Sequence, residues 1–278
     1  MLRVYTMKSY QPSFFDESER LAALSRLKDP LEELANRIDF EMFRPLLTEA
    51  LRCKADRKSP AGRKPLDVIL MFKALIIQRL FNLSDEQLEY QITDRLSFTR
   101  FLGLHIGETI PDYTSFWGFR EALAEKGLER QLFDHFTAKL EAEGVFAKTG
   151  SIIDATIVEV PRQRNKREEN ERIKAGQVPA EWDDHKRVHK DTDARWVKKN
   201  GVSFFGYKDH VKTDSGTNLI SDYRVTSANV HDSTPFAEMV GEADQGTSMH
   251  GDSAYKSAET DEYMDCLLYT SPSPRDRG

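Results

Sequence analysis

The chain has 278 residues and a formal net charge of −6; 39% of its residues are hydrophobic and 31% are charged. This apolar content excludes a wholly disordered chain, and two cysteines far apart in the sequence, Cys53 and Cys266, exclude a disulfide framework and a thiolate zinc site. The cysteine usage suits a reducing cytoplasm, and the N-terminal stretch lacks the continuous apolar segment of a secretion signal.

The first half of the chain predicts helices. Leu, Ile and Phe recur at three- and four-residue spacings across residues 17–146. Asp29 followed by Pro30 is typical of a helix start, and Ser84 and Gln87 have the spacing of a capping box. An all-helical N-terminal domain over residues 1–143 is therefore expected.

The most apolar stretch of the chain covers residues 66–81 and contains Asp67, Lys73 and Arg79. A membrane-spanning helix needs about 20 mostly apolar residues, and this stretch is both shorter and interrupted by charges. We therefore expect a buried core helix here and no membrane partner.

A pair of predicted helices, residues 82–98 and 113–127, is joined by a short connection and resembles a helix-turn-helix. In that reading the second helix lies in a DNA major groove, and Thr114, Ser115 and Arg120 are the candidates for base contacts. The alternative is ordinary packing, because any helical bundle contains such pairs.

From residue 144 onward the apolar pattern changes to that of strands, rich in β-branched and aromatic residues. A hairpin turning on residues 214–217 and a helix over 233–244 are also expected. Helices that follow antiparallel strands indicate a mixed α/β sheet, so the fold class is α+β. The expected strands cover residues 151–160, 203–214, 218–232 and the start of 248–257.

Positive charge is concentrated in residues 161–199, which hold twelve Lys and Arg against eight Asp and Glu, a net charge of +4. The rest of the chain holds 28 against 38, a net charge of −10. Such a basic segment can bind DNA phosphates, although a solvated loop of mixed charge is the simpler alternative. The best candidates for phosphate contacts are Arg162, Arg164, Lys166 and Arg167.

Two carboxylates have similar settings in the second half. Asp154 lies within the apolar strand SIIDATIVEV, and Asp252 follows the short strand at SMHG. A carboxylate in such a strand is costly unless it is paired, and two converging anions repel unless a cation lies between them. Mg²⁺ suits two carboxylates, whereas capping of a bulge or pairing with a lysine is the structural alternative.

Three further residues are candidates near that site. Lys208 and Lys212 alternate with other residues along one strand and so share a face, from which they could contact phosphate. His210 lies between them and could orient carboxylates or touch DNA. A solvated strand face and ordinary strand hydrogen bonding are the respective alternatives.

Four motifs follow one another in the second half of the chain: SIIDATIVEV, FFGYKDHVKTD, LISDYRVTSANVHDS and HGDSAYKS. In this order they resemble the catalytic domain of bacterial insertion-sequence transposases of the DDE class, in particular the insertion sequence five family. The helical stretches between about residue 13 and residue 123 are similar to that family's N-terminal domain, so the resemblance runs from about residue 13 to about 264.

The resemblance implies a ribonuclease H-like fold interrupted after its first strand by the basic insertion 161–199. It implies Asp154 and Asp252 as the first two acidic ligands of Mg²⁺ or Mn²⁺, with metal-activated water cutting a phosphodiester and the freed 3′-hydroxyl attacking target DNA. It also implies double-stranded DNA as partner (terminal inverted repeats and target), a homodimer that synapses two ends, and a cytoplasmic, nucleoid-associated bacterial protein.

The sequence departs from the family pattern at its end. The family's third acid is a Glu on a helix well downstream, and we expect this chain to stop before it, with no strand-transfer activity as the consequence. Residues 266–278 resemble translated sequencing-adapter DNA, so the catalytic domain is expected over 144–265. The nearby acids come too early to be that Glu: Glu259, Asp261, Glu262 and Asp265.

Two other functions stay open from the sequence. A metal-dependent nuclease of the same fold would hydrolyse DNA without joining it. A non-catalytic DNA-binding protein or regulator derived from a transposase would bind ends without cutting them.

Overall fold

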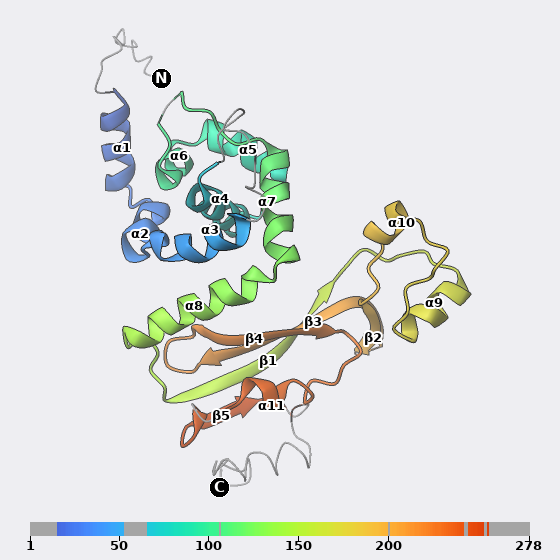
Figure 1. Cartoon of the computed structure of the whole chain (residues 1–278). Helices are drawn as coiled ribbons and strands as arrows, with labels where there is room; N and C mark the ends of the chain where they lie inside the picture. Colours follow the sequence, from blue (N-terminus) through green and yellow to red (C-terminus); the bar gives the residue numbers. More distant parts are fainter. Residues whose placement is uncertain are drawn as a thin grey trace, which may run out of the picture. The chain divides into compact units, whose positions relative to one another are not determined.

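The computed structural model divides into two compact units, Met1–Phe136 and Thr137–Gly278 (Figure 1). None of the helices in the part of the chain that is described is long and apolar enough to cross a membrane. The described residues are 16–52, 66–105, 107–199, 201–241, 244–252 and 255.

The first unit is built from helices, as its apolar spacing predicts (Figure 1). Its elements are α1 (Asp16–Arg26), α2 (Pro30–Arg37), the 3-10 helix η1 (Phe40–Phe43), α3 (Arg44–Arg52), α4 (Val68–Leu80), α5 (Asp85–Asp94), α6 (Leu96–Leu102), α7 (Tyr113–Glu125) and the start of α8 (Leu128–Ala142).

The helix starts follow the predicted capping residues. The Asp29 side chain accepts a hydrogen bond from the Leu31 N–H at 3.0 Å, with Pro30 in the first turn. Ser84 and Gln87 form the reciprocal capping box at the start of α5. These local signals therefore place α2 and α5 correctly.

The single helix predicted over residues 82–98 is wrong, because the chain breaks between α5 and α6. Arg95 adopts an extended backbone conformation, with φ −103° and ψ 114°. The break turns α6 so that Phe98 and Phe101 enter the core, while Leu88 and Ile92 reach it from α5. The free energy gained by burying the apolar side chains of both helices outweighs the cost of interrupting one helix.

Helix α4 is the buried core helix that its composition predicts. Ala74 and Ile77 are fully buried, and they pack in one apolar cluster with Phe116 of α7 and Leu47 of α3. Asp67 lies just outside the helix as its N-cap, where its carboxylate accepts hydrogen bonds from two backbone N–H groups at 2.9 and 3.0 Å. The charge at this end therefore stabilises the helix without entering the core.

The second unit is a five-stranded mixed sheet with strand order β2-β3-β1-β5, in which β4 also pairs with β3 (Figure 1). Only β5 runs parallel to β1; the other pairs are antiparallel. The strands are β1 (Gly150–Glu159), β2 (Arg195–Lys199), β3 (Val202–Asp214), β4 (Ile220–Ser227) and β5 (Ser248–Gly251), with α11 (Phe236–Met239) between β4 and β5.

The charged insertion 161–199 is partly structured. It contains α9 (Arg167–Lys174), α10 (Asp184–Val188) and strand β2, which the sequence did not predict. Glu169 joins the two helices by accepting hydrogen bonds from Trp182 and Lys186 at 2.8 and 2.6 Å. The hydrogen bond from Lys186, with others, lowers the pKa of Glu169 to about 2.

The helix expected over 233–244 is much shorter, since α11 spans Phe236–Met239 alone. Its buried side chain Phe236 packs with Ile153 of β1, Val240 and Tyr255 against one face of the sheet. That contact defines the covered face, and the opposite face of β1 is open.

The hairpin between β3 and β4 turns where the sequence predicts, and Asp214 organises it. Its buried carboxylate accepts hydrogen bonds from the backbone N–H groups of Lys148, Gly216 and Thr217 at 2.8, 3.1 and 2.8 Å. Burial alone would raise the pKa of Asp214, but these donors outweigh it and hold the pKa below its usual value.

We expect Asp214→Asn to lower the free energy of unfolding by about 1.5–3 kcal/mol at pH 7, because charge-assisted hydrogen bonds are lost. The native pKa is depressed, so this contribution is present above the unfolded pKa of about 3.9 and is lost as the pH falls through the native pKa. Urea unfolding at pH 7 and at acidic pH measures both effects.

The matched control is Glu159→Gln, at an exposed position of β1. It should change the free energy of unfolding by less than about 0.5 kcal/mol. An Asp214→Asn variant as stable as wild type at pH 7 would contradict the role of this carboxylate in the turn.

Candidate active site

Strand register brings Asp154 and Asp252 together. In the parallel pairing of β1 with β5, Ile153 lies opposite Gly251. The next position along each strand is Asp154 and Asp252, and neighbouring strands lie about 4.8 Å apart with paired side chains on the same face. We therefore expect the two carboxylates to lie near each other at the end of β5.

Both residues are exposed, which corrects the expectation of a buried carboxylate in β1. Side chains alternate along this strand, so that Ile153 is 1% exposed and Ile152 is 40% exposed. Asp154 shares the open face with Ile152, and its carboxylate accepts a hydrogen bond from the Ala155 N–H at 2.8 Å. The anion thus needs no buried partner to be tolerated.

The pKa of Tyr255 responds to the negative charges near the two acids. Burial raises the pKa of its phenol first, and the charges of Asp232, Asp154 and Asp252 raise it further. Its hydroxyl lies 3.4 Å from His210 Nδ1. The charges of these three carboxylates therefore all reach the Tyr255 phenol.

The two adjacent carboxylates fit the oxygen ligands that Mg²⁺ prefers, since this ion is commonly held by one or two carboxylates plus water and substrate phosphate. Within the described ranges, no group of three or more His, Cys, Asp or Glu side chains is placed to hold a metal ion. The acids considered after Asp252 lie outside the described residues: Glu259, Asp261, Glu262 and Asp265.

One face of β3 carries Lys208, His210 and Lys212, as predicted. This face is the covered face of the sheet, whereas Asp154 lies on the open face. Their partners in β1 are Ile157, Ala155 and Ile153, which alternate with the residues on the open face such as Asp154. The expected contacts with phosphate therefore do not fit this arrangement, because α11 and its neighbours cover that side.

Each of these three side chains has a partner inside the unit. Lys212 is 8% exposed, and its Nζ lies 2.6 Å from the Asp244 carboxylate. Lys208 Nζ lies 2.7 Å from Asp232 Oδ1, as an ion pair and not as an aligned hydrogen bond. His210 is fully buried, and its Nε2 lies 3.0 Å from the Thr226 hydroxyl.

Burial lowers the pKa of His210, and the charge of Lys208 adds to the effect although Asp232 opposes it. A neutral imidazole fits a fully buried position with hydroxyl neighbours. The role of His210 is therefore to support the sheet under the carboxylates.

The basic residues at the start of the insertion are exposed, as a contact with phosphate requires. The Arg162 guanidinium lies 5.3 Å from the centre of the Trp196 ring, and Arg167 pairs with Glu171 at 3.2 Å. Arg162 and Arg164 have no ion-pair partner among the residues that the structure describes. The positive charge here is available to an anionic partner.

The candidate base-reading residues of α7 have different surroundings. Thr114 is exposed, and its hydroxyl donates to Asp112 at 2.7 Å, while Ser115 is half-buried. Arg120 donates to both carboxylate oxygens of Asp85 at 2.8 and 2.9 Å. Arg120 therefore joins α7 to α5, which corrects the expectation that it reads bases.

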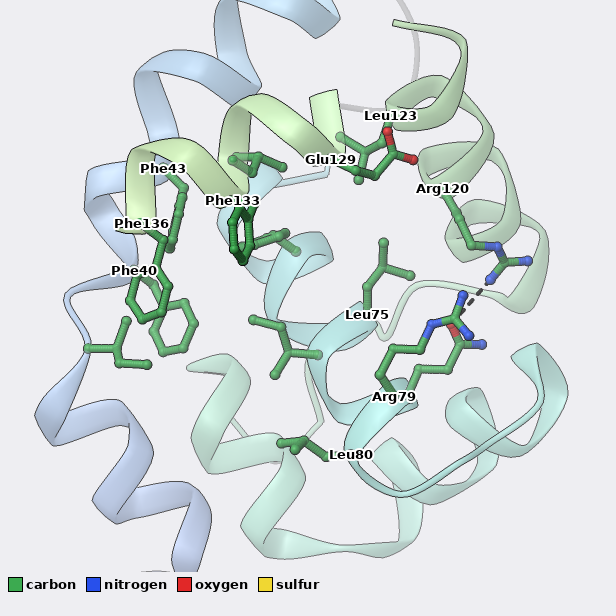
Figure 2. Close-up of a pocket in the computed structure, with 15 residues that line it drawn as sticks. Phe40, Phe43, Leu75, Arg79, Leu80, Arg120, Leu123, Glu129, Phe133 and Phe136 are labelled. Atoms are coloured by element: carbon green, nitrogen blue, oxygen red, sulfur yellow. Dashed lines mark hydrogen bonds between the residues drawn. The ribbon is translucent and has the colours of Figure 1, made fainter. Parts of the chain in front are cut away.

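A mostly apolar pocket of about 480 Å³ lies in the first unit beside Arg120 (Figure 2). Aromatic and aliphatic side chains such as Phe43, Leu75 and Phe136 line it, and its charged lining residues are Arg79, Arg120 and Glu129. It has no acid pair comparable to Asp154 and Asp252, so it is not the candidate site of chemistry.

Two family models match separate segments of the chain, one in the helical part and one in the sheet part. Residues 19–122 match the family model of a transposase domain, DUF772, and residues 146–270 match that of a transposase DDE domain. No solved structure matches the chain. The helical part and the sheet part are thus each similar to a domain of transposases.

We expect Lys212→Ala to lower the free energy of unfolding by about 3–5 kcal/mol, because Asp244 is left as an uncompensated buried charge. The double variant Lys212→Met with Asp244→Asn should recover a large part of that loss. Urea unfolding of both variants measures the loss of stability and its recovery.

Lys199→Ala, at an exposed end of β2, is the matched control and should be nearly neutral. If Lys212→Ala cost no more than this control, Lys212 would be free to act elsewhere, and the structural role assigned to it would be wrong.

Proposed function

We propose that this chain, which combines a transposase domain with a transposase DDE domain, cleaves DNA at the ends of an insertion sequence of the insertion sequence five family and joins them to target DNA. Asp154 and Asp252 hold the Mg²⁺ or Mn²⁺ on which both steps depend. The observation that supports this assignment is the β1–β5 register, in which Ile153 lies opposite Gly251, each directly before one of the two acids.

The proposed chemistry needs a polarised phosphodiester and an activated attacking oxygen, and a divalent metal supplies both when it is bound. The chain's own contribution is to present two carboxylates from one face of a sheet whose other face is fixed by buried pairs. A ribonuclease H-like fold is our interpretation of this mixed sheet, in which a parallel strand is added beside β1.

Double-stranded DNA, as terminal inverted repeats and target, is the proposed substrate. The exposed cations after β1 would contact its phosphates, which fixes position and makes the affinity fall with salt. Thr114 is the exposed candidate for a base contact on α7. Two ends must be brought together, so we propose that the chain acts as a homodimer.

A non-catalytic DNA-binding protein is the second candidate. It is favoured by the presence of two acids, and no third, at the site within the described residues. The two functions share the DNA contacts and differ in turnover alone, so an assay of the reaction products separates them.

We expect Asp154→Ala and Asp252→Ala each to weaken Mn²⁺ binding by at least about tenfold, because one of two charged ligands is lost. Titration of the full chain followed by the electron paramagnetic resonance signal of free Mn²⁺ measures this without requiring turnover. Glu159→Gln, at an exposed acid further along β1, should bind Mn²⁺ as wild type does. Equal affinity in all four proteins would refute the metal site.

Turnover is tested with DNA ends flanking the gene, Mg²⁺ and a target plasmid. Joined products indicate a transposase, cut products alone a nuclease, and binding without products a DNA-binding protein. Binding to the ends should survive Asp154→Ala in each case.

A further inference from the structure

An aromatic pair is exposed where β2 meets β3. Trp196 and Phe205 are direct cross-strand partners, and their ring centres lie 5.3 Å apart at an angle of 44°. Trp196 is 52% exposed even though indole is among the largest apolar side chains. An indole left in water on a regular strand is a feature of binding surfaces.

Cations surround this pair. The exposed Arg162 guanidinium lies over the Trp196 ring at 5.3 Å from its centre, and Lys198 and Lys199 are exposed on the same strand as the indole. Flat aromatic surface combined with positive charge matches the two parts of a nucleic-acid strand, since bases stack on aromatic rings and phosphates pair with cations.

The pair lies on the same sheet face as the carboxylates. Asp154 pairs with Val211 of β3, and Phe205 is six residues from Val211 on that strand, so alternation returns its side chain to the same face. At about 3.3 Å per residue the separation along the strand is about 20 Å.

Strands β1 and β3 approach each other closely between the aromatic pair and Asp154. A Cβ added at Gly206, where φ is +155°, would lie 2.0 Å from the carbonyl oxygen of Val158. The strands can pack this tightly only with glycine at that position. The aromatic pair therefore keeps a constant distance from Asp154.

We propose that Trp196, supported by Phe205, stacks on a base of single-stranded DNA that passes over the face bearing Asp154 and Asp252. The inference rests on the proposed DNA-processing function. A stacked base displaces the Arg162 guanidinium from the ring, and because Arg162 has no ion-pair partner among the described residues it is then free to pair with a phosphate. Bases inside a duplex have no free face, so the platform selects unpaired strands.

Fluorescence anisotropy of the full chain with a labelled 12-nucleotide single strand, and with the matching blunt duplex, tests the proposal. We expect Trp196→Ala to weaken single-strand binding by about 5- to 100-fold and duplex binding by less than about twofold. Trp196→Phe should retain most of the affinity for the single strand, because a phenyl ring still stacks.

Leu27→Ala, at an exposed apolar position just after α1 in the first unit, is the control and should leave both affinities unchanged. Circular dichroism melting confirms that each variant is folded. An unchanged affinity of Trp196→Ala for the single strand, or an equal loss for both DNA forms, would overturn the proposal while leaving metal binding by Asp154 and Asp252 intact. Wild-type protein that bound neither DNA form would overturn this proposal together with the DNA-binding part of the function.

Discussion

The register of β5 against β1 is the constraint on which the candidate chemistry depends. Side chains alternate along a strand, so a slip of one residue would turn Asp252 to the opposite face from Asp154. The register is held at its start by Gly150 opposite Ser248, where an added Cβ would lie 2.3 Å from the serine hydroxyl. At its other end Tyr255 packs on the covered face with Phe236. Local packing thus decides whether two acids are neighbours.

The two faces of the sheet differ in burial and in charge pairing. One face carries the buried ion pair of Lys212 with Asp244 and the half-buried ion pair of Lys208 with Asp232. The other leaves Asp154 and several apolar side chains in water. Buried ion pairs are costly to break, so they specify one arrangement of strands, and the exposed face can then vary in what it binds. Stability and recognition therefore depend on different side chains of the same strands.

Local signals in the sequence predicted the elements that depend on neighbouring residues, such as the capping box at Ser84 and the turn at Asp214. They could not predict strand β2, because its short, mostly basic sequence within a charged segment resembles a loop until it pairs with β3. Alternation along β3 correctly predicted that Lys208 and Lys212 share a face. It could not predict that this face is covered, because the covering helix α11 comes later in the chain. Arg120 was assigned to DNA for the same reason, since its partner Asp85 is 35 residues away. Each acid of the proposed carboxylate pair lies at a recognisable strand, so the pair could be proposed from the sequence, and its role in metal binding stays a prediction.

The insertion follows the C-terminal end of β1, whereas β5 pairs with the N-terminal end of that strand. It rejoins the sheet at β2, which pairs with the part of β3 that adjoins this C-terminal end. Its helices α9 and α10 are tied to each other through Glu169 and not to the β1–β5 pair. Lengthening or shortening this segment would therefore leave the acids undisturbed. Related chains could diverge freely here, acquiring different nucleic-acid preferences on an unchanged scaffold for phosphodiester chemistry.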